Sequence, residues 1–226
     1  MPSYRRKRRR RWNPRFVRLC LLLTLLALTA AVLRILLADR GPEAEGVEVP
    51  SYVRQDFIPV NEWSRPGTEL EKIDGVVIHY VGNPGTTAEA NRNYFASLSS
   101  GAEGTYASSH FVVGLEGEVL QCIPLTEIAY ASKDRNGDTV AIEVCHPDET
   151  GEFSEVTYER VVELTAWLCR TFELDAQEDV IRHYDVTGKR CPLYYVEHPE
   201  AWETFLADTA ARLERLSVEA EQSSRE

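Results

Sequence analysis

The feature that most restricts the fold of this chain is the β-branched run Val76-Val77-Ile78-His79-Tyr80-Val81, which ends at the turn Gly82-Asn83-Pro84-Gly85. An apolar run without polar alternation is typical of a strand that is buried on both faces, and such a strand needs covering elements on both sides of its sheet. The run therefore predicts a layered α/β domain, with His79 near the carboxyl end of an inner strand.

Other strand-like runs alternate with helix-like patterns along the chain. Strands are predicted at residues 108–114, 118–125, 139–145 and 180–183. Helices with one apolar face are predicted at residues 86–98, 154–172 and 199–216. The first two of these strands flank a turn at residues 115–117, so they form a hairpin. Together these patterns predict an α/β fold with a mixed central β-sheet flanked by helices.

Charge is divided sharply along the sequence. Residues 1–19 carry nine Lys or Arg and no acid, whereas all 36 Asp and Glu lie from Asp39 onward. The acidic part repels nucleic acid, and the basic part adjoins an apolar stretch at residues 20–38, a pairing that is typical of membrane targeting. A nucleic-acid partner is therefore excluded.

Residues 20–38 have the length of a membrane-crossing helix, since a rise of about 1.5 Å per residue nearly spans a hydrocarbon core of about 30 Å. The sequence thus predicts a basic cytoplasmic segment (1–19) and a transmembrane signal-anchor (20–38), preceding a domain that lies outside the cytoplasm at the cell membrane. A cleaved signal peptide is the alternative, and it would make the protein secreted. The lack of a clear small-x-small site near Ala38 favours the anchor.

The remainder divides into a tether, a domain and a tail. Residues 39–56 are acidic and contain Gly and Pro, which predicts a tether. Residues 57–216 form the domain, and the polar residues 217–226 a flexible tail. The cysteines are too scattered to indicate a disulfide scaffold, and Cys169 fits a helix core.

A histidine and a cysteine stand eight residues apart in the string His183-Tyr184-Asp185-Val186-Thr187-Gly188-Lys189-Arg190-Cys191-Pro192. A Gly-containing turn between them allows both side chains to converge on one metal ion. The spacing alone does not distinguish such a pair from two unrelated residues.

Four blocks in order resemble the type-2 N-acetylmuramoyl-L-alanine amidases, over residues 74–195. The blocks are residues 76–79, 108–113, 140–145 and 183–192. The resemblance implies a zinc centre held by His79, His183 and Cys191, and peptidoglycan as the partner. Three protein ligands leave one position open, as in catalytic zinc sites where bound water is acidified. His110, in an apolar strand, is expected to pack or orient rather than to ligate.

The resemblance also assigns catalytic roles to Glu143, as the general base, and to Lys189, as a stabiliser of the oxyanion. The alternatives are a salt-bridged rim glutamate and a solvated lysine. A carboxylate in the apolar run 140–144 needs a polar partner, which favours the functional interpretation. Ser109 stands where other branches carry a tyrosine, which increases the weight on Glu143. Asp185 is a candidate to accept the second ring N–H of a liganding histidine.

One departure concerns substrate contacts. Where several relatives have Trp-His-Ala-Gly, this chain has Ala129-Tyr130-Ala131-Ser132. Tyr130 is a candidate stacking residue, and Tyr80, Asn83 and Tyr106 are further cleft candidates. The resemblance implies a zinc-dependent hydrolase that cuts the amide between N-acetylmuramic acid and L-alanine. A non-catalytic peptidoglycan-binding module of the same fold is the alternative, which retention of Cys191 disfavours.

Overall fold

The computed structural model describes residues 24, 28–29, 44–70 and 72–223, and the chain divides into two units, residues 1–40 and 41–226. The predicted cytoplasmic segment and all but three residues of the predicted transmembrane segment lie outside the described residues. Within the described part, no helix combines the length and the apolar character that a membrane crossing needs. The account below concerns the second unit.

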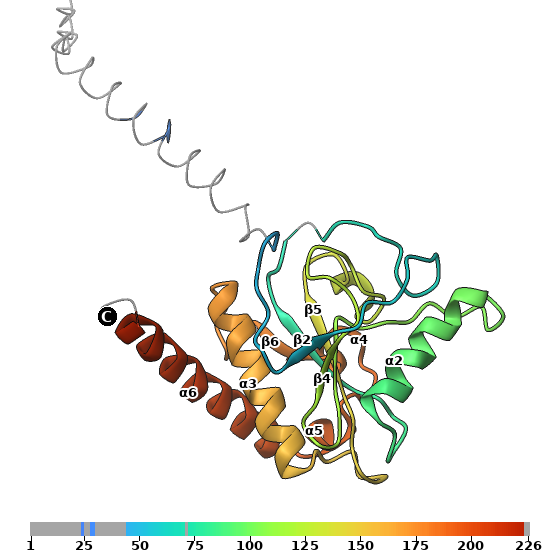
Figure 1. The fold of residues 1–226 in the computed structure, drawn as a ribbon. Coiled ribbons are helices and arrows are strands. Elements are labelled where there is room, and N and C mark those ends of the chain that lie inside the picture. Colours follow the sequence, from blue (N-terminus) through green and yellow to red (C-terminus); the bar gives the residue numbers. More distant parts are fainter. Residues whose placement is uncertain (1–23, 25–27, 30–43, 71, 224–226) are drawn as a thin grey trace, which may run out of the picture. The chain divides into compact units, whose positions relative to one another are not determined.

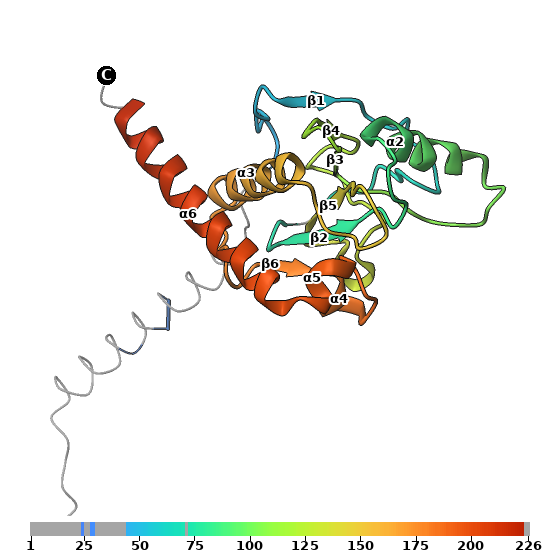
Figure 2. The ribbon, with the colours of Figure 1, turned by 90° about the horizontal axis from the view of Figure 1, so that it is seen from below.

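A six-stranded sheet forms the centre of this unit, in the order β1-β4-β3-β5-β2-β6 (Figures 1 and 2). Its strands are β1 (Val53–Gln55), β2 (Val76–Tyr80), β3 (Phe111–Val113), β4 (Val119–Gln121), β5 (Val140–Val144) and β6 (Val180–Arg182). Only the β3–β4 pair is antiparallel among these strands. The predicted mixed sheet and its hairpin are therefore confirmed.

The helices follow the predicted pattern and add short elements. They are α2 (Ala88–Ser97), η1 (Leu98–Ser100), η2 (Lys133–Arg135), α3 (Glu155–Thr171), α4 (His183–Thr187), α5 (Leu193–Glu197) and α6 (Pro199–Ser223). The hydroxyls of Thr87 and Ser154 accept main-chain N–H groups at the starts of α2 and α3. These caps satisfy donors that a helix start otherwise leaves free, which fixes where each helix begins.

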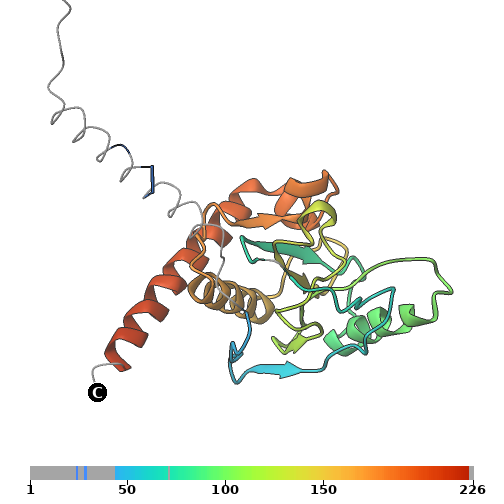
Figure 3. The same cartoon turned by 90° about the horizontal axis from the view of Figure 1, so that it is seen from above.

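Alternating side chains place two separate cores on the two faces of the sheet. Phe111, Val113 and Ile142 pack in the core that α3 and α6 cover, as does Cys169 of α3. Val112 and Leu120 point the other way, into a smaller core with Phe95 of α2. Figure 2 shows α3 and α6 on one side of the strands and α2 on the other, and Figure 3 agrees. The inner strands are thus buried on both faces, as their unbroken apolar runs predict.

Two predicted boundaries are wrong. Part of the predicted tether belongs to the domain: β1 pairs with β4 at the sheet edge, Val53 is buried, and Val47 and Val49 pack on the larger core. Strand β1 has only three residues, and only one of them is buried. The sequence therefore shows no apolar–polar alternation that would predict this strand. The predicted tail is helical as far as Ser223, because no Gly or Pro interrupts residues 217–223.

The α2 face of the sheet positions the site. Ile78 and Ile142 point into the larger core, so their neighbours His79 and Glu143 point to the opposite face. On that face α2 packs on β3 and β4, whereas His79 lies on β2, on the other side of β5 in the strand order. His79 and Glu143 also lie toward the carboxyl ends of β2 and β5, where open α/β sheets bind ligands.

Candidate metal centre

The structure brings His79, His183 and Cys191 together. One ligand atom from each lies within 4.8 Å of the others, and all three side chains are buried. His79 is the fourth residue of β2, while His183 directly follows β6, the neighbour of β2 in the sheet. The parallel pairing therefore places both imidazoles at the same edge, with ring centroids 4.5 Å apart.

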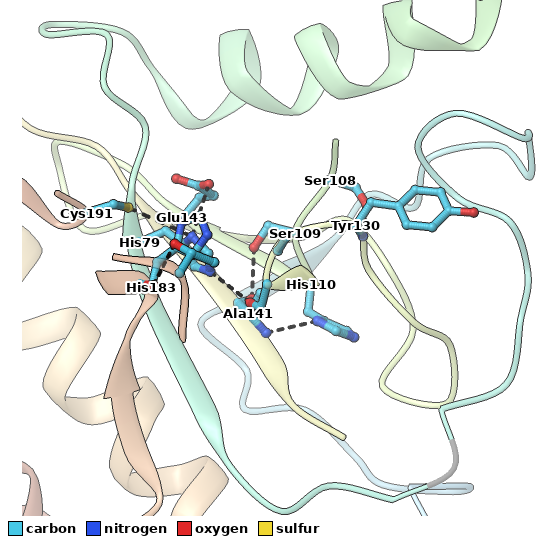
Figure 4. A network of polar contacts seen from close by, with 12 residues as sticks. His79, Ser108, Ser109, His110, Tyr130, Ala141, Glu143, His183 and Cys191 are labelled. Atoms are coloured by element: carbon cyan, nitrogen blue, oxygen red, sulfur yellow. Dashed lines mark hydrogen bonds and ion pairs between the residues drawn. The ribbon is translucent and has the colours of Figure 1, made fainter. Parts of the chain in front are cut away.

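A single tight turn returns the chain from His183 to Cys191. The short helix α4 ends at Gly188, whose φ of 74° is left-handed and favours glycine. The main-chain N–H of Tyr184 then donates to the carbonyl of Cys191 at 2.9 Å. The thiol consequently lies 3.9 Å from Nδ1 of His79, as Figure 4 shows. His183 and Cys191 thus meet across the glycine turn, an arrangement that the family resemblance implies.

Burial keeps both imidazoles neutral. It is the main cause that lowers the pKa of His79 well below its usual value and that of His183 to about 4, and the charge of Lys189 lowers both further. A neutral imidazole has a free lone pair at one ring nitrogen, which is the form that binds a metal ion.

The Cys191 thiol has a raised pKa, in contrast to the lowered values of the two histidines. Burial and the nearby Glu143 raise the pKa of the Cys191 thiol to about 12, against the lowering effects of the Tyr80 main-chain N–H and of Lys189. Thiols ligate metals as thiolates. A cation bound at this place would supply the positive charge that stabilises the thiolate and that the buried surroundings lack.

The donor set fits a zinc ion. Nδ1 of His183 is buried and makes no hydrogen bond within the described part of the chain, which is costly unless another partner binds it. Two imidazoles and one thiolate are common zinc ligands, and three protein ligands leave a position for solvent or substrate. His79, His183 and Cys191 are therefore the residues that would hold zinc here.

Glu143 lies directly beside this group. It is the register partner of His79 in the parallel β2–β5 pair, and its Oε1 is 3.9 Å from Nδ1 of His79. The side chain is only 17% exposed, and Oε2 has no hydrogen-bond partner among the described residues. Burial raises the pKa of this carboxyl to about 8, although Lys189 opposes the shift. A rim glutamate held in a salt bridge to Lys or Arg would not have this environment.

Lys189 borders a cleft of about 580 Å³ that opens beside the metal-ligand group. Tyr106, Tyr130, Lys133 and His183 also line it, and none of its lining residues is acidic. In a chain with a net charge of −11, two lysines in a cleft that no acidic residue lines favour a ligand that carries negative charge. Of the four predicted cleft residues, Tyr106 and Tyr130 are placed here.

Asn83 and Tyr80 are not in this cleft. Asn83 is exposed, and its carbonyl accepts a hydrogen bond from Thr86. Tyr80 stacks on His146 with ring centroids 5.0 Å apart. The sequence predicted no role for His146. This residue is buried, and it follows the predicted strand 139–145 without any spacing motif that singles it out.

The role suggested for Asp185 is wrong. Its carboxylate accepts the main-chain N–H of Arg182 at 2.9 Å and pairs with the Arg182 guanidinium at 2.8 Å, which caps α4. The residue that contacts His79 instead is Ser132, whose Oγ is 3.2 Å from Nε2. No pattern in the sequence indicates Ser132, because its position depends on the loop that leads from β4 to η2.

His110 orients main-chain groups, in keeping with the prediction. Its Nδ1 accepts the N–H of Ala141 at 3.0 Å, and its Nε2–H donates to the carbonyl of Glu127 at 2.9 Å. Ser109 donates to the carbonyl of Ala141 at 2.9 Å. Figure 4 shows both side chains beside β5. They complete the β3–β5 pairing where the ladder ends.

Comparison with known proteins identifies the family. A family model described as N-acetylmuramoyl-L-alanine amidase matches residues 69–193, more than half of the chain. The chain belongs to the N-acetylmuramoyl-L-alanine amidase family. The matched range of this amidase family includes the three candidate ligands as well as Glu143 and Lys189.

Individual relatives agree with this amidase assignment. The chain is 31% identical over 188 residues to the N-acetylmuramoyl-L-alanine amidase BlyA of Bacillus subtilis (strain 168), covering 74% of this chain and 49% of BlyA. It is 34% identical over 184 residues to a probable N-acetylmuramoyl-L-alanine amidase of Bacillus licheniformis, covering 76% and 51%. The chain thus spans about half the length of these curated relatives.

A solved structure shares the fold. The solved structure of PlyL superposes with a TM-score of 0.61 at 20% identity, covering 71% of this chain and 98% of PlyL. At this identity the likeness concerns the fold alone. It extends over nearly the whole of PlyL, so the mixed sheet with its flanking helices is the architecture the two proteins share.

Proposed function

We propose that this protein hydrolyses, with zinc, the amide bond between N-acetylmuramic acid and L-alanine in peptidoglycan. One observation carries the proposal: two neutral imidazoles and a thiol converge within 4.8 Å beside Glu143, whose buried Oε2 has no hydrogen-bond partner among the described residues. Membership of the amidase family and the printed names of its relatives supply the substrate class.

Each residue has a distinct task. His79, His183 and Cys191 would hold zinc, which when bound polarises a carbonyl as a Lewis acid and acidifies water. Glu143 is the general base, because its carboxylate lies beside the ligands and its raised pKa suits proton transfer near neutral pH. Lys189 would stabilise the negative charge that develops on the amide oxygen.

The proton balance of the reaction needs only one residue. Glu143 accepts the proton that the attacking water loses as its oxygen bonds to the lactyl carbonyl carbon. Glu143 then returns that proton to the amide nitrogen as the carbon–nitrogen bond breaks. The products are the lactyl carboxylic acid and a stem peptide with a free L-alanine amine, so Glu143 ends the cycle in its starting state.

The cleft beside the ligands suits such a substrate. Tyr106 and Tyr130 are in edge-to-face contact, with centroids 5.4 Å apart, and Tyr106 stacks on Trp63. Aromatic faces of this kind pack on apolar groups, while Lys133 can pair with a carboxylate of the peptide. His183 lines the same cleft, so a peptide bound there would lie beside the proposed metal.

A non-catalytic peptidoglycan-binding module is the alternative function. A binding module has no use for a carboxylate oxygen that is buried without a hydrogen-bond partner, as Oε2 of Glu143 is among the described residues, since such a group destabilises the fold. Retention of Glu143 together with Cys191 therefore favours the hydrolase.

We also propose that residues 20–38 anchor the protein in the cell membrane with its domain outside the cytoplasm. The proposal rests on the nine cations that precede an apolar stretch of 19 residues. The topology is tested by fusing reporter enzymes after Arg40. A reporter that is active only outside the cytoplasm should be active, and one that is active only in the cytoplasm should not. Carbonate extraction of membranes separates an anchored protein from one released by cleavage.

Product analysis tests the proposed reaction. The purified protein is incubated with peptidoglycan, and mass spectrometry identifies the new chain ends. We expect peptides with a free L-alanine amine and intact glycan strands. New reducing sugar ends, or binding without any released peptide, would contradict the proposal.

A further inference from the structure

The two ring nitrogens of His79 face different surroundings. Nδ1 faces the ligand group, 3.9 Å from the sulfur of Cys191. Nε2 points away from that group and lies 3.2 Å from Oγ of Ser132. Both residues are 1% exposed, so bulk water does not compete for this contact.

The loop that carries Ser132 is fixed by its own hydrogen bonds. Oδ1 of Asn136 accepts the main-chain N–H of Ser132 at 2.6 Å and that of Ala131 at 3.1 Å. The N–H of Arg135 donates to the carbonyl of Ser132 at 3.0 Å. At the other end, the Tyr130 N–H donates to Oγ of Ser108 at 2.9 Å. The main chain that carries the Ser132 hydroxyl is thereby held in place.

We propose that Ser132 is a positioning residue for the metal centre: its hydroxyl accepts the Nε2–H of His79 and so keeps the lone pair of that ring on Nδ1. A liganding histidine commonly donates its other ring N–H to a fixed acceptor, which sets the tautomer and the ring orientation. The inference rests on the proposed zinc site. It assigns to a serine the role that the sequence suggested for Asp185.

The geometry distinguishes Ser132 from the other polar groups nearby. Asp185 is paired with Arg182, and the ring of His110 is bonded to Ala141 and Glu127. Among the described residues, the hydrogen-bond partner of Nε2 of His79 is Ser132. A serine acceptor carries no charge, so it orients the ring without adding a carboxylate to a site that already holds Glu143.

Zinc affinity is the first readout. Ser132→Ala removes the acceptor, and Ser132→Thr retains a hydroxyl. Ser109→Ala is the matched control, because Ser109 is also buried but bonds to main-chain carbonyls. Zinc competition against a chromophoric chelator gives the dissociation constant of each purified full-length variant. We expect Ser132→Ala to bind zinc about 10- to 100-fold more weakly, Ser132→Thr to recover most of the loss, and Ser109→Ala to match the wild type.

The tautomer of His79 is the second readout, and it requires no variant to fold. Nitrogen chemical shifts of the ring in the wild-type protein should show a protonated Nε2 both before and after zinc is added. A ring protonated on Nδ1 in the zinc-loaded protein, or equal zinc affinity in Ser132→Ala and wild type, would overturn the role of Ser132 and leave the zinc site standing. Failure of the wild type to bind zinc would overturn both.

Discussion

His79 and Glu143 are direct register partners in the parallel pair β2–β5, with Nδ1 and Oε1 3.9 Å apart. Main-chain pairing of two buried strands therefore sets the distance between a proposed metal ligand and the proposed base. Neither residue depends on a mobile loop for its place. Sites built on inner strands hold their geometry closely, and the pair gives the hydrolase proposal its most specific geometric basis.

The first prediction concerns the base. Glu143→Gln keeps the shape of the side chain but removes its ability to accept a proton, so we expect kcat to fall by about 10²- to 10⁴-fold. Zinc content should not change, because Glu143 is not among the proposed ligands. The matched control is Glu163→Gln, which alters a partly exposed glutamate of α3 that pairs with Arg160. Equal rates for Glu143→Gln and wild type would remove the base from the mechanism.

The second prediction concerns pH and Lys189. A general base acts when deprotonated, so activity should be lost as pH falls through the pKa of Glu143. Burial raises that pKa and the charge of Lys189 lowers it. In Lys189→Met the pKa therefore rises, and the ascending limb of the pH–kcat profile should move to higher pH.

The plateau of the same profile reports the second role of Lys189. Loss of an oxyanion stabiliser should lower the plateau by about 10²- to 10³-fold. Lys72→Met, at a lysine paired with Asp74, should keep the wild-type profile. If the plateau falls but the ascending limb does not move, Lys189 stabilises the oxyanion but does not lower the pKa of Glu143.

These roles show what the sequence could and could not predict. The apolar runs around His79 and Glu143 predicted the strands, and parallel pairing then brings their carboxyl ends together. The glycine turn between His183 and Cys191 allowed their convergence, and the family resemblance predicted it. Ser132 was not predictable, because its contact with His79 spans 53 positions and depends on a loop with no periodic pattern. Asp185 was misassigned because its carboxylate pairs with Arg182, three residues earlier in the chain, and not with a histidine.

The third prediction concerns acid stability through His110. Burial lowers the pKa of His110 from 6.5 to about 4, so between these values the unfolded chain binds more protons than the folded one. Its contribution to stability is thus full above about pH 6.5 and is lost as pH falls toward 4. At about pH 5 the loss from this one group amounts to about 2 kcal/mol.

Urea unfolding near neutral pH and at about pH 5 measures this effect. In His110→Gln the difference in the free energy of unfolding between the two pH values should be smaller than in the wild type by about that 2 kcal/mol. His198→Gln, which changes an exposed histidine, should keep the wild-type difference. An unchanged difference in His110→Gln would mean that His110 is not a buried neutral group.

The fourth prediction concerns the cleft. Lys133→Glu places a negative charge beside the proposed peptide-binding wall, so KM for peptidoglycan fragments should rise by about 2- to 10-fold while kcat changes little. Lys72→Glu reverses a charge elsewhere and should leave KM unchanged. A fall in kcat with constant KM would place Lys133 in the chemistry instead of in binding.

Zinc titration of the chelator-treated protein tests the central claim most directly. We expect release of peptides with a free L-alanine amine to return in proportion to bound zinc and to reach its maximum at one ion per chain, while Cys191→Ser recovers neither zinc nor activity. Undiminished peptide release from protein that holds no zinc would contradict the account.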